Sequence, residues 1–305
     1  MPKVAIGLPV FNGADYLAEA ITSILGQTFG DFELLISDNA SDDTTEEICR
    51  HYVGQDRRVQ YVRQARNIGA ANNHNFLVRQ TVGQYFKWAA HDDVLEPRFL
   101  EASVATLDAQ PDVVLASPAS DLIDEAGQVL PYSPERGGVI DRSGVCWPPL
   151  PENNPSLMAS DPAARFKAVM LNMVMCVEIF GVMRREALIQ TPLQAPFGGA
   201  DKVLLAQMAL LGPFWLGPEV LFHRRCHAKQ YSSASSGAYR AAWFSGQKES
   251  LLQQQLKLLL AYCHAVQASR LGAPQRMKCY RSICRRALLR GHQLRRLTSG
   301  LVGNQ

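Results

Sequence analysis

Short apolar runs alternate with helix-period segments through the first half of the chain, and this alternation limits the possible folds more than any other feature. The first apolar run is 4–8, and a segment with apolar residues on one helical face follows from Asp15. Further strands are expected at 32–36, 59–62, 85–89 and 113–116, with helices from Thr44, at 70–82 and after Pro97. In the second half, strands are expected near 177–183 and at 220–223. Repeated units of this kind predict an α/β fold, in which helices flank a mostly parallel, Rossmann-like sheet.

Composition is compatible with one such domain plus additions at the C-terminus. The chain has 305 residues, 47% of them hydrophobic and 19% charged, which is typical of a globular protein and excludes disordered and fibrous classes. The net charge of +3 is small, but the stretch 270–296 carries nine basic residues and no carboxylate. These are Arg270, Arg276, Lys278, Arg281, Arg285, Arg286, Arg290, Arg295 and Arg296. We therefore expect basic C-terminal helices that could meet an anionic surface.

Cysteine usage and hydropathy favour a cytoplasmic protein. The seven cysteines are scattered and form no Cys-x-x-Cys pair, so they suit a reducing compartment better than a zinc or redox motif. No signal-peptide pattern follows Met1, and nowhere do about 18 apolar residues run together. The C-terminal helices are expected to contact the inner face of a membrane only as an accessory to the protein's main function.

Polar side chains gather where the expected strands end. They are Asn12, Asp38, Asn39, Asn67, His91, Asp92 and Asp93. Because ligands of such sheets bind beyond the carboxyl ends of the strands, these side chains should share one rim. The segment 131–162 is rich in Pro, Gly, Ser and Asn, and it is expected to form a long loop or lid.

Two neighbouring carboxylates, Asp92 and Asp93, follow the strand at 85–89. They repel each other unless a cation lies between them, and hard oxygen ligands suit Mg²⁺ or Mn²⁺ completed by phosphate oxygens and water. The alternative is a solvated loop that only caps the next helix.

Several separate motifs together resemble the family 2 glycosyltransferases of the GT-A fold over about the first 235 residues. The motifs are Gly7-Leu8-Pro9-Val10-Phe11-Asn12-Gly13, Ser23 to Thr28, Phe32 to Asp42, Arg66 to Asn75, and His91-Asp92-Asp93. The resemblance implies a GT-A domain at 1–235, with a nucleotide-binding half at about 1–120 and an acceptor half at about 121–235. A basic helical extension would occupy 236–305.

The resemblance also implies residues for the donor nucleotide. Pro9 and Phe11 would border the base, and Asp38 would accept the imino proton of uracil or thymine, which selects a UDP- or dTDP-sugar over cytosine nucleotides. Asp38 could instead be a turn residue. Arg66 would lie near the base or the diphosphate, with a solvated surface arginine as the alternative.

At the metal motif, the family pattern assigns Asp92 to the ribose hydroxyls or to a metal-bound water. It assigns Asp93 to the Mn²⁺ or Mg²⁺ ion that bridges the two phosphates. Ala90 occupies the position at which the family commonly has its first aspartate. Asp93 is therefore the main expected carboxylate ligand of the metal. His227 would be a further metal ligand, with His223 as its competitor and a structural role as the alternative.

The expected catalytic residue is Asp201, at the start of a helix preceded by Gly198 and Gly199. An inverting transfer needs one base to take the proton of the acceptor hydroxyl as that oxygen attacks the anomeric carbon. The family usually has Glu-Asp here, and Ala200 replaces the glutamate. A plain helix N-cap is the alternative role.

The expected acceptor is a saccharide or a lipid-linked molecule, and the sugar, the linkage and the oligomeric state stay open. Trp147 could stack on a sugar ring. One competing function is another nucleotide-binding α/β enzyme, such as a nucleotidyltransferase, although no Gly-x-Gly-x-x-Gly or Gly-x-x-x-x-Gly-Lys motif is present. The other is a protein that binds membrane or nucleic acid through its basic helices, and no nucleic-acid partner is expected for the enzyme.

Overall fold

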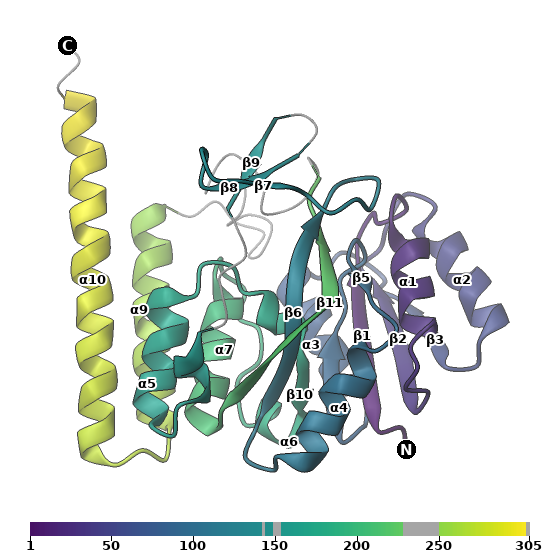
Figure 1. Ribbon diagram of the computed structural model, residues 1–305, viewed down its shortest axis with the longest axis horizontal. Helices are drawn as coiled ribbons and strands as arrows, with labels where there is room; N and C mark the ends of the chain where they lie inside the picture. Colours follow the sequence, from purple (N-terminus) through teal and green to yellow (C-terminus); the bar gives the residue numbers. More distant parts are fainter. Residues whose placement is uncertain (142–143, 149–153, 228–249, 303–305) are drawn as a thin grey trace.

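Helices and strands follow the predicted order through the first 123 residues, with one unpredicted short strand at Val94–Leu95, in a computed structural model that describes residues 1–141, 144–148, 154–227 and 250–302. The elements are β1 (Val4–Val10), α1 (Leu17–Leu25), β2 (Phe32–Asp38), α2 (Thr45–Gln55), β3 (Val59–Arg63), α3 (Ala70–Gln80), β4 (Tyr85–Trp88), β5 (Val94–Leu95), α4 (Phe99–Ala109) and β6 (Leu115–Ile123). Helices cover both faces of the sheet that these strands form (Figure 1).

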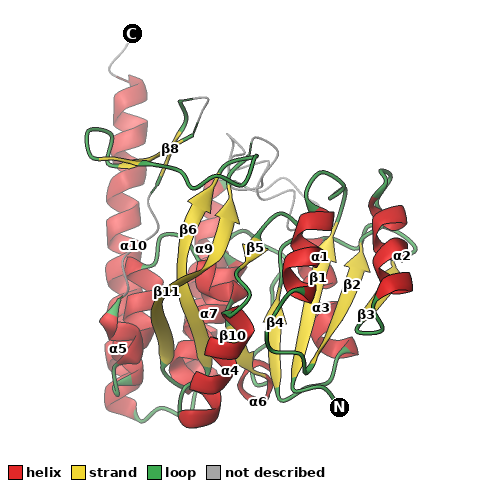
Figure 2. Cartoon of the chain, turned by 45° about the vertical axis from the view of Figure 1, so that its right-hand side comes forward, coloured by secondary structure: helices red, strands yellow, loops and turns green. Residues whose placement is uncertain are grey.

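The central sheet has eight strands in the order β3-β2-β1-β4-β10-β6-β11-β5. β1 pairs in parallel with β2 and β4, β2 with β3, and β6 with β11 (Phe214–Arg225). β10 (Val182–Arg184) is antiparallel to both of its neighbours, and β5 is antiparallel to β11. Figure 2 shows the strands as one twisted sheet. The predicted mostly parallel α/β sheet is therefore confirmed.

The second half departs from the expected elements in two places. The segment expected as a loop or lid contains a small antiparallel sheet of β7 (Tyr132–Ser133), β8 (Gly138–Ile140) and β9 (Cys146–Trp147), because Val139 and Trp147 pack against Leu122 and Leu130. The strand expected near 177–183 begins only at Val182, after a 3-10 turn at Val177–Phe180. Gly181 lies against the backbone of Ala116, so only the residues after it enter the gap between β4 and β6.

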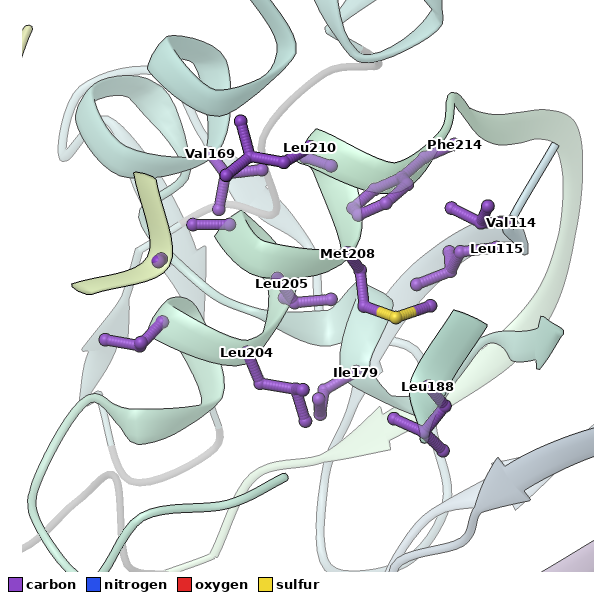
Figure 3. Close-up of a cluster of buried hydrophobic side chains, with 14 of the residues drawn as sticks. Val114, Leu115, Val169, Ile179, Leu188, Leu204, Leu205, Met208, Leu210 and Phe214 are labelled. Atoms are coloured by element: carbon purple, nitrogen blue, oxygen red, sulfur yellow. The ribbon is translucent and has the colours of Figure 1, made fainter. Parts of the chain in front are cut away.

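Alternate residues of β1 serve two separate cores. Val4, Ile6 and Leu8 pack with α1 and α4 on one face of the sheet, whereas Ala5 packs with α3 and the second-half helices on the other. The second core is centred on α7 (Ala200–Leu211), which presents Leu204, Leu205 and Met208 to its neighbours (Figure 3). α5 (Pro162–Lys167) and a following π-helical turn at Ala168–Asn172 pack beside α7.

The C-terminal helices α9 (Leu251–Ala268) and α10 (Ala273–Val302) share this second core. Tyr262 and Val266 of α9 and Cys279 and Ile283 of α10 are buried in the same cluster as α7. α10 runs alongside α9 at one edge of the molecule (Figure 1). The predicted boundary between 235 and 236 lies outside the described residues. Within the described ranges, no helix is both long enough and apolar enough to cross a bilayer.

Candidate functional site

The carboxyl ends of β1 and β4 and the start of α7 border one cavity of about 1380 Å³. This cavity brings together residues from both halves of the chain. Among its lining residues are the predicted Pro9, Phe11, Arg66, Asp92, Asp93, Asp201 and His227. Asp38 is the predicted site residue that does not line it.

The loop after β1 forms one end of the cavity. Its backbone is held by the Asn12 N–H, which donates to Ser41 Oγ at 2.9 Å, while Asn12 itself has a positive φ of 52°. Gly13 is packed so closely that a Cβ would lie 2.8 Å from the His91 ring. This constraint leaves Phe11, with 41% of its surface exposed, at the mouth of the cavity.

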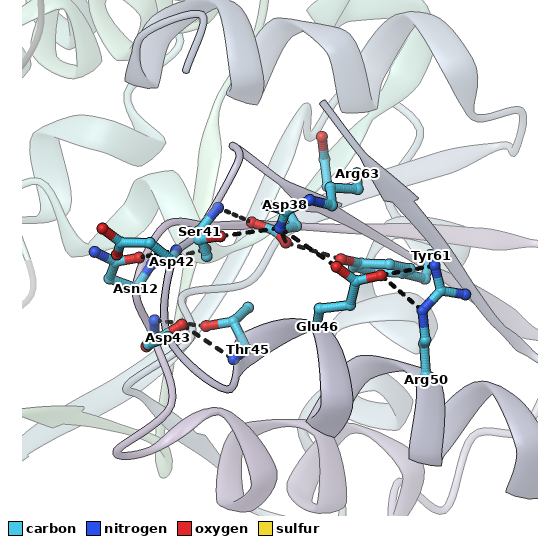
Figure 4. Close-up of polar contacts among 12 residues, drawn as sticks. Asn12, Asp38, Ser41, Asp42, Asp43, Thr45, Glu46, Arg50, Tyr61 and Arg63 are labelled. Atoms are coloured by element: carbon cyan, nitrogen blue, oxygen red, sulfur yellow. Dashed lines mark hydrogen bonds and ion pairs between the residues drawn. The ribbon is translucent and has the colours of Figure 1, made fainter. Parts of the chain in front are cut away.

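Asp38, for which the sequence predicts base recognition, lies outside the lining of the cavity. Its side chain is fully buried, and Oδ1 accepts the Ser41 N–H at 2.8 Å. Oδ2 accepts the Tyr61 hydroxyl at 2.8 Å and an Arg63 guanidinium N–H at 3.2 Å (Figure 4). The carboxylate therefore holds β2, β3 and the following turn together and does not face the cavity.

We expect the Asp38→Asn variant to lose about 1–3 kcal/mol of unfolding free energy, because one buried carboxylate oxygen becomes an N–H donor that faces other donors. Urea denaturation measures this loss. Asp42→Asn, on the exposed side of the same turn, is the matched control and should unfold like the parent. A normal urea midpoint for Asp38→Asn would contradict the structural role.

Asn39, next along the chain, takes the place at the cavity that was predicted for Asp38. Its amide N–H donates to Asn67 Oδ1 at 2.9 Å, and its Oδ1 accepts the Ile68 N–H at 2.8 Å. Both asparagines and Arg66 line the cavity. Because successive residues at a strand end point to opposite sides, the sequence could locate this pair but not which member faces the ligand.

Asp92, Asp93 and His227 form the acidic centre of the cavity. Asp92 Oδ2 lies 3.0 Å from His227 Nε2, and Asp93 Oδ1 accepts the Arg225 backbone N–H at 3.0 Å. Burial, followed by the charge of Asp92, raises the pKa of Asp93 well above that of an ordinary carboxyl. Burial also acts to raise the pKa of Asp92, but His91 and His227 outweigh it and leave that pKa lowered.

The donor atoms suit a hard divalent ion that is completed by a ligand. Within the described part of the chain, no three His, Cys, Asp or Glu side chains form a preassembled metal site. Ions such as Mg²⁺, however, are held by one or two carboxylates plus substrate phosphates and water. Asp92 Oδ2 and His227 Nε2 are hydrogen-bonded at 3.0 Å, so these two possible ligand atoms lie side by side in the cavity.

His223 lies away from the cavity. Its Nδ1 is 2.5 Å from Asp121 Oδ1, and its Nε2 is 2.8 Å from Glu96 Oε1. The hydrogen bond with Asp121 and, against the effect of burial, the contact with Glu96 raise the pKa of His223 to about 9. His227, which follows β11, thus lines the cavity. His223, within β11, instead forms ion pairs with Glu96 and Asp121.

The His223 cluster should make stability depend on pH. An unperturbed histidine has a pKa of 6.5, so its raised folded-state pKa adds stability that is complete below pH 6.5 and is lost as pH rises through about 9. We expect the unfolding free energy of the parent, relative to that of His223→Gln, to fall by about 2 kcal/mol across this window. Denaturant titrations at several pH values measure it. Exposed His51→Gln is the control, and parallel curves for parent and His223→Gln would refute the linkage.

Asp201 lies in the first turn of α7, at the other wall of the cavity. Gly199 precedes the helix with a φ of 85°, a conformation that glycine adopts without strain. Asp201 Oδ1 accepts the Lys202 N–H at 2.7 Å. Burial raises the pKa of Asp201, although the Lys202 N–H bond opposes it. A carboxylate with a raised pKa is a better proton acceptor than an ordinary one.

Two cations of the cavity, Arg224 and Lys202, were not singled out from the sequence. Arg224 lines the cavity with Asp93 and Asp201, and its charge acts to lower the pKa of both carboxyls. Its neighbour Arg225 points the other way, and its guanidinium donates to the backbone of Asp92 at 2.9 Å. The alternation of β11 could have separated the two arginines, but their strand extends further than the sequence pattern indicated.

Trp147 lines the cavity as an ordered part of β9. Its indole N–H donates to Asp141 Oδ2 at 2.8 Å, and only 9% of its surface is exposed. Met170 and Met173 are buried in the core, whereas Met175 lines the cavity.

Comparison with known proteins identifies the family. A family model described as "Glycosyl transferase family 2" matches residues 5–190. An uncharacterized glycosyltransferase of Rickettsia felis is 33% identical over 154 residues, which cover 49% of this chain and 25% of that protein. One from Methanocaldococcus jannaschii is 30% identical over 138 residues, covering 44% and 48%. The chain thus spans about a quarter to a half of the length of these relatives.

Solved structures support the fold. S. aureus TarS, in complex with UDP-GlcNAc, superposes with a TM-score of 0.63 at 15% identity over 90% of this chain and 69% of that one. The mannosyltransferase PcManGT from Pyrobaculum calidifontis, in complex with GDP-Man and Mn²⁺, gives 0.57 at 16% identity over 92% and 68%. The predicted GT-A fold is confirmed, and because the family model covers more than half of its residues, this chain belongs to glycosyl transferase family 2.

Proposed function

We propose that this protein is an inverting glycosyltransferase, which moves a sugar from a UDP- or dTDP-sugar to an acceptor hydroxyl with the help of a divalent ion. One observation carries the proposal. A single cavity combines an aromatic border at Phe11, the acidic centre at Asp92 and Asp93, and a separate carboxylate at Asp201. These are the parts that a donor nucleotide, its diphosphate and a deprotonated acceptor require.

For the base, we assign recognition to Asn39 with Pro9 and Phe11 beside it. A side-chain amide presents one acceptor and one donor side by side, which match the N–H and the adjacent carbonyl of uracil or thymine. Arg66, which also lines the cavity, would neutralise charge near the base or diphosphate. That TarS was solved with UDP-GlcNAc agrees with a uridine nucleotide, while PcManGT with GDP-Man is the reason to test guanine as well.

We assign the ion to Asp93 and His227, and we add Asp92 because of its contact with His227. In this assignment, Asp92 would also contact the ribose hydroxyls of the donor. When bound, Mn²⁺ or Mg²⁺ would neutralise charge on the departing nucleoside diphosphate. That PcManGT was solved with Mn²⁺ supports the choice of metals.

The transfer step uses the chain's own groups. Asp201 takes the proton of the acceptor hydroxyl while that oxygen forms its bond to the anomeric carbon. The bond from that carbon to the diphosphate breaks on the opposite face, so the configuration inverts. Arg224, which lines the same cavity as Asp93 and Asp201, stabilises the negative charge that develops on the leaving oxygen.

A thermal-shift panel tests the donor assignment, because a ligand that binds only the native state raises its melting temperature. The panel contains UDP, dTDP and GDP, each with and without Mn²⁺. We expect UDP or dTDP to give the larger shift, and Mn²⁺ to increase it. The absence of a shift with every nucleotide would overturn the proposed function, and a larger shift with GDP would overturn the assignment of the base.

We further propose a peripheral contact between α10 and an anionic lipid surface. One face of the helix exposes apolar and basic side chains at spacings of three and four residues: Met277, Arg281, Arg285, Leu288 and Leu289. Arginines among exposed apolar residues are complementary to anionic headgroups.

Liposome flotation tests this contact. We expect the protein to bind vesicles that contain phosphatidylglycerol more than vesicles of phosphatidylcholine alone, and less at high salt. Combined Arg281→Glu and Arg285→Glu should abolish the difference. Arg57→Glu with Arg79→Glu, at exposed sites elsewhere, is a control of equal net charge. No binding at low salt, or equal loss in both double variants, would reject the surface.

A further inference from the structure

Arg286 of α10 lines the cavity, although α10 lies at the outer edge of the molecule (Figure 1). Only 9% of the Arg286 residue is exposed, whereas Arg281 and Arg285 on the same helix are exposed. The helical period and the packing of α10 against α5 and α9 therefore turn one of its arginines inward, at the cavity.

The Arg286 guanidinium has no acidic partner among the described residues. Its one hydrogen bond there is to the Met170 carbonyl, at 2.6 Å, and it lies 5.6 Å from the centre of the Tyr262 ring. Its buried Nε has no hydrogen-bond partner within the described chain. A buried charge without a counter-ion is costly, so this position favours an anion supplied from the cavity.

The place of Arg286 points to the acceptor and not to the donor. The residues assigned to the nucleotide lie at or after the carboxyl ends of β1, β2, β3 and β4. Arg286, in contrast, stands on an element that packs against α5, α9 and the turn at Ala168–Asn172. Val174, Met175 and Ile179 from the second half line the same cavity. An anionic group beside an apolar portion would fit this combination of side chains.

We propose that Arg286 is a specificity-determining residue, which binds a negatively charged oxygen group of an amphiphilic acceptor. The inference rests on the proposed glycosyl transfer and narrows the acceptor to molecules that carry a negative charge. A guanidinium forms bidentate hydrogen bonds with phosphate and with carboxylate, so these are the two candidate groups. The basic C-terminal extension is then part of the acceptor site, in addition to any contact with a lipid surface.

Calorimetric titration with three eight-carbon probes tests this role. The probes are octyl phosphate, octanoate and the neutral octyl glucoside, each below its micelle concentration and with the protein saturated by UDP and Mn²⁺ so that the donor site is filled. We expect one of the anionic probes to bind at least about 10-fold more tightly than octyl glucoside. Whether octyl phosphate or octanoate binds better distinguishes the two chemistries.

Variants separate charge from packing. Arg286→Gln should remove the preference for the anion and leave octyl glucoside and UDP affinity unchanged, while Arg286→Lys should keep most of the preference. Arg285→Gln, exposed on the adjacent position, should behave like the parent. If Arg286→Gln does not fold, Arg286→Lys decides the matter, because loss of the anion preference in a folded lysine variant contradicts a role for charge.

Two outcomes overturn the inference and leave the proposed function standing. One is equal affinity for anionic and neutral probes in a protein that binds UDP normally. The other is an anion preference that survives Arg286→Gln. Failure of UDP to bind at all would instead count against the proposed function, so the two failures are distinguishable.

Discussion

Replacing Asp201 with asparagine is expected to lower kcat by about 100- to 10,000-fold, with UDP affinity within about twofold of the parent. Asparagine keeps the size of the side chain but cannot take the acceptor proton. Asp201 lines the cavity and its pKa is raised by burial, as suits a proton acceptor. Turnover of a UDP- or dTDP-sugar, measured by release of the nucleoside diphosphate, gives kcat, and calorimetry gives the affinity.

The dependence on pH supplies a second measure of the same residue. A base must be deprotonated to act, so parent activity should fall as pH drops through the raised pKa of Asp201. That acidic decline should be absent from the residual activity of Asp201→Asn. The matched control is Asp161→Asn, because Asp161 also stands at a helix start but caps α5 outside the cavity. It should retain parent kcat, and full activity in Asp201→Asn would show that another group is the base.

The second large effect is expected from Asp93→Asn, which should weaken UDP binding in Mn²⁺ by at least about 10- to 100-fold. The change removes a negative charge from the acidic centre, where Asp92 and His227 alone would remain to hold the ion. Without Mn²⁺ the affinity of the variant should equal that of the parent. Calorimetric titrations of UDP with Mn²⁺ and with a chelator measure both quantities.

A carboxylate outside the cavity provides the control for Asp93. Asp121→Asn alters the ion pair with His223 but no lining residue, so its metal-dependent affinity should be that of the parent. An Asp93→Asn variant that keeps its response to Mn²⁺ would exclude Asp93 as a ligand. The proposal would then depend on Asp92 and His227, and Asp92→Asn would decide it.

Much of the first half was predictable because local pattern and tertiary structure agree there. β1, β2 and β4 are fully or nearly fully buried and mostly apolar, and α1, between β1 and β2, has a clear apolar face. The second half was harder because its short elements depend on distant neighbours. Val182 enters the sheet only because β4 and β6 leave a gap between them, and β9 exists only because Trp147 packs against Leu122.

The sequence by itself determined that a parallel α/β sheet would place polar side chains at the carboxyl ends of its strands. It so located six residues that line one cavity: Asn12, Asn39, Asn67, His91, Asp92 and Asp93. This worked because strand direction fixes the edge at which such residues lie. Only the tertiary structure decided orientation: Asn39 faces the cavity and Asp38 is buried, and His227 meets Asp92 while His223 pairs with Asp121.

The tertiary structure also decided the orientation of Arg286, which lines the cavity. From the sequence, Arg286 is only one of nine basic residues in the stretch 270–296. Which arginine enters the cavity depends on how α10 packs against α5 and α9, and that packing is set by apolar contacts far from the site along the chain. A sequence pattern fixes the edge or face on which a residue lies, whereas the partner that the side chain meets is set by the packing of elements distant in sequence.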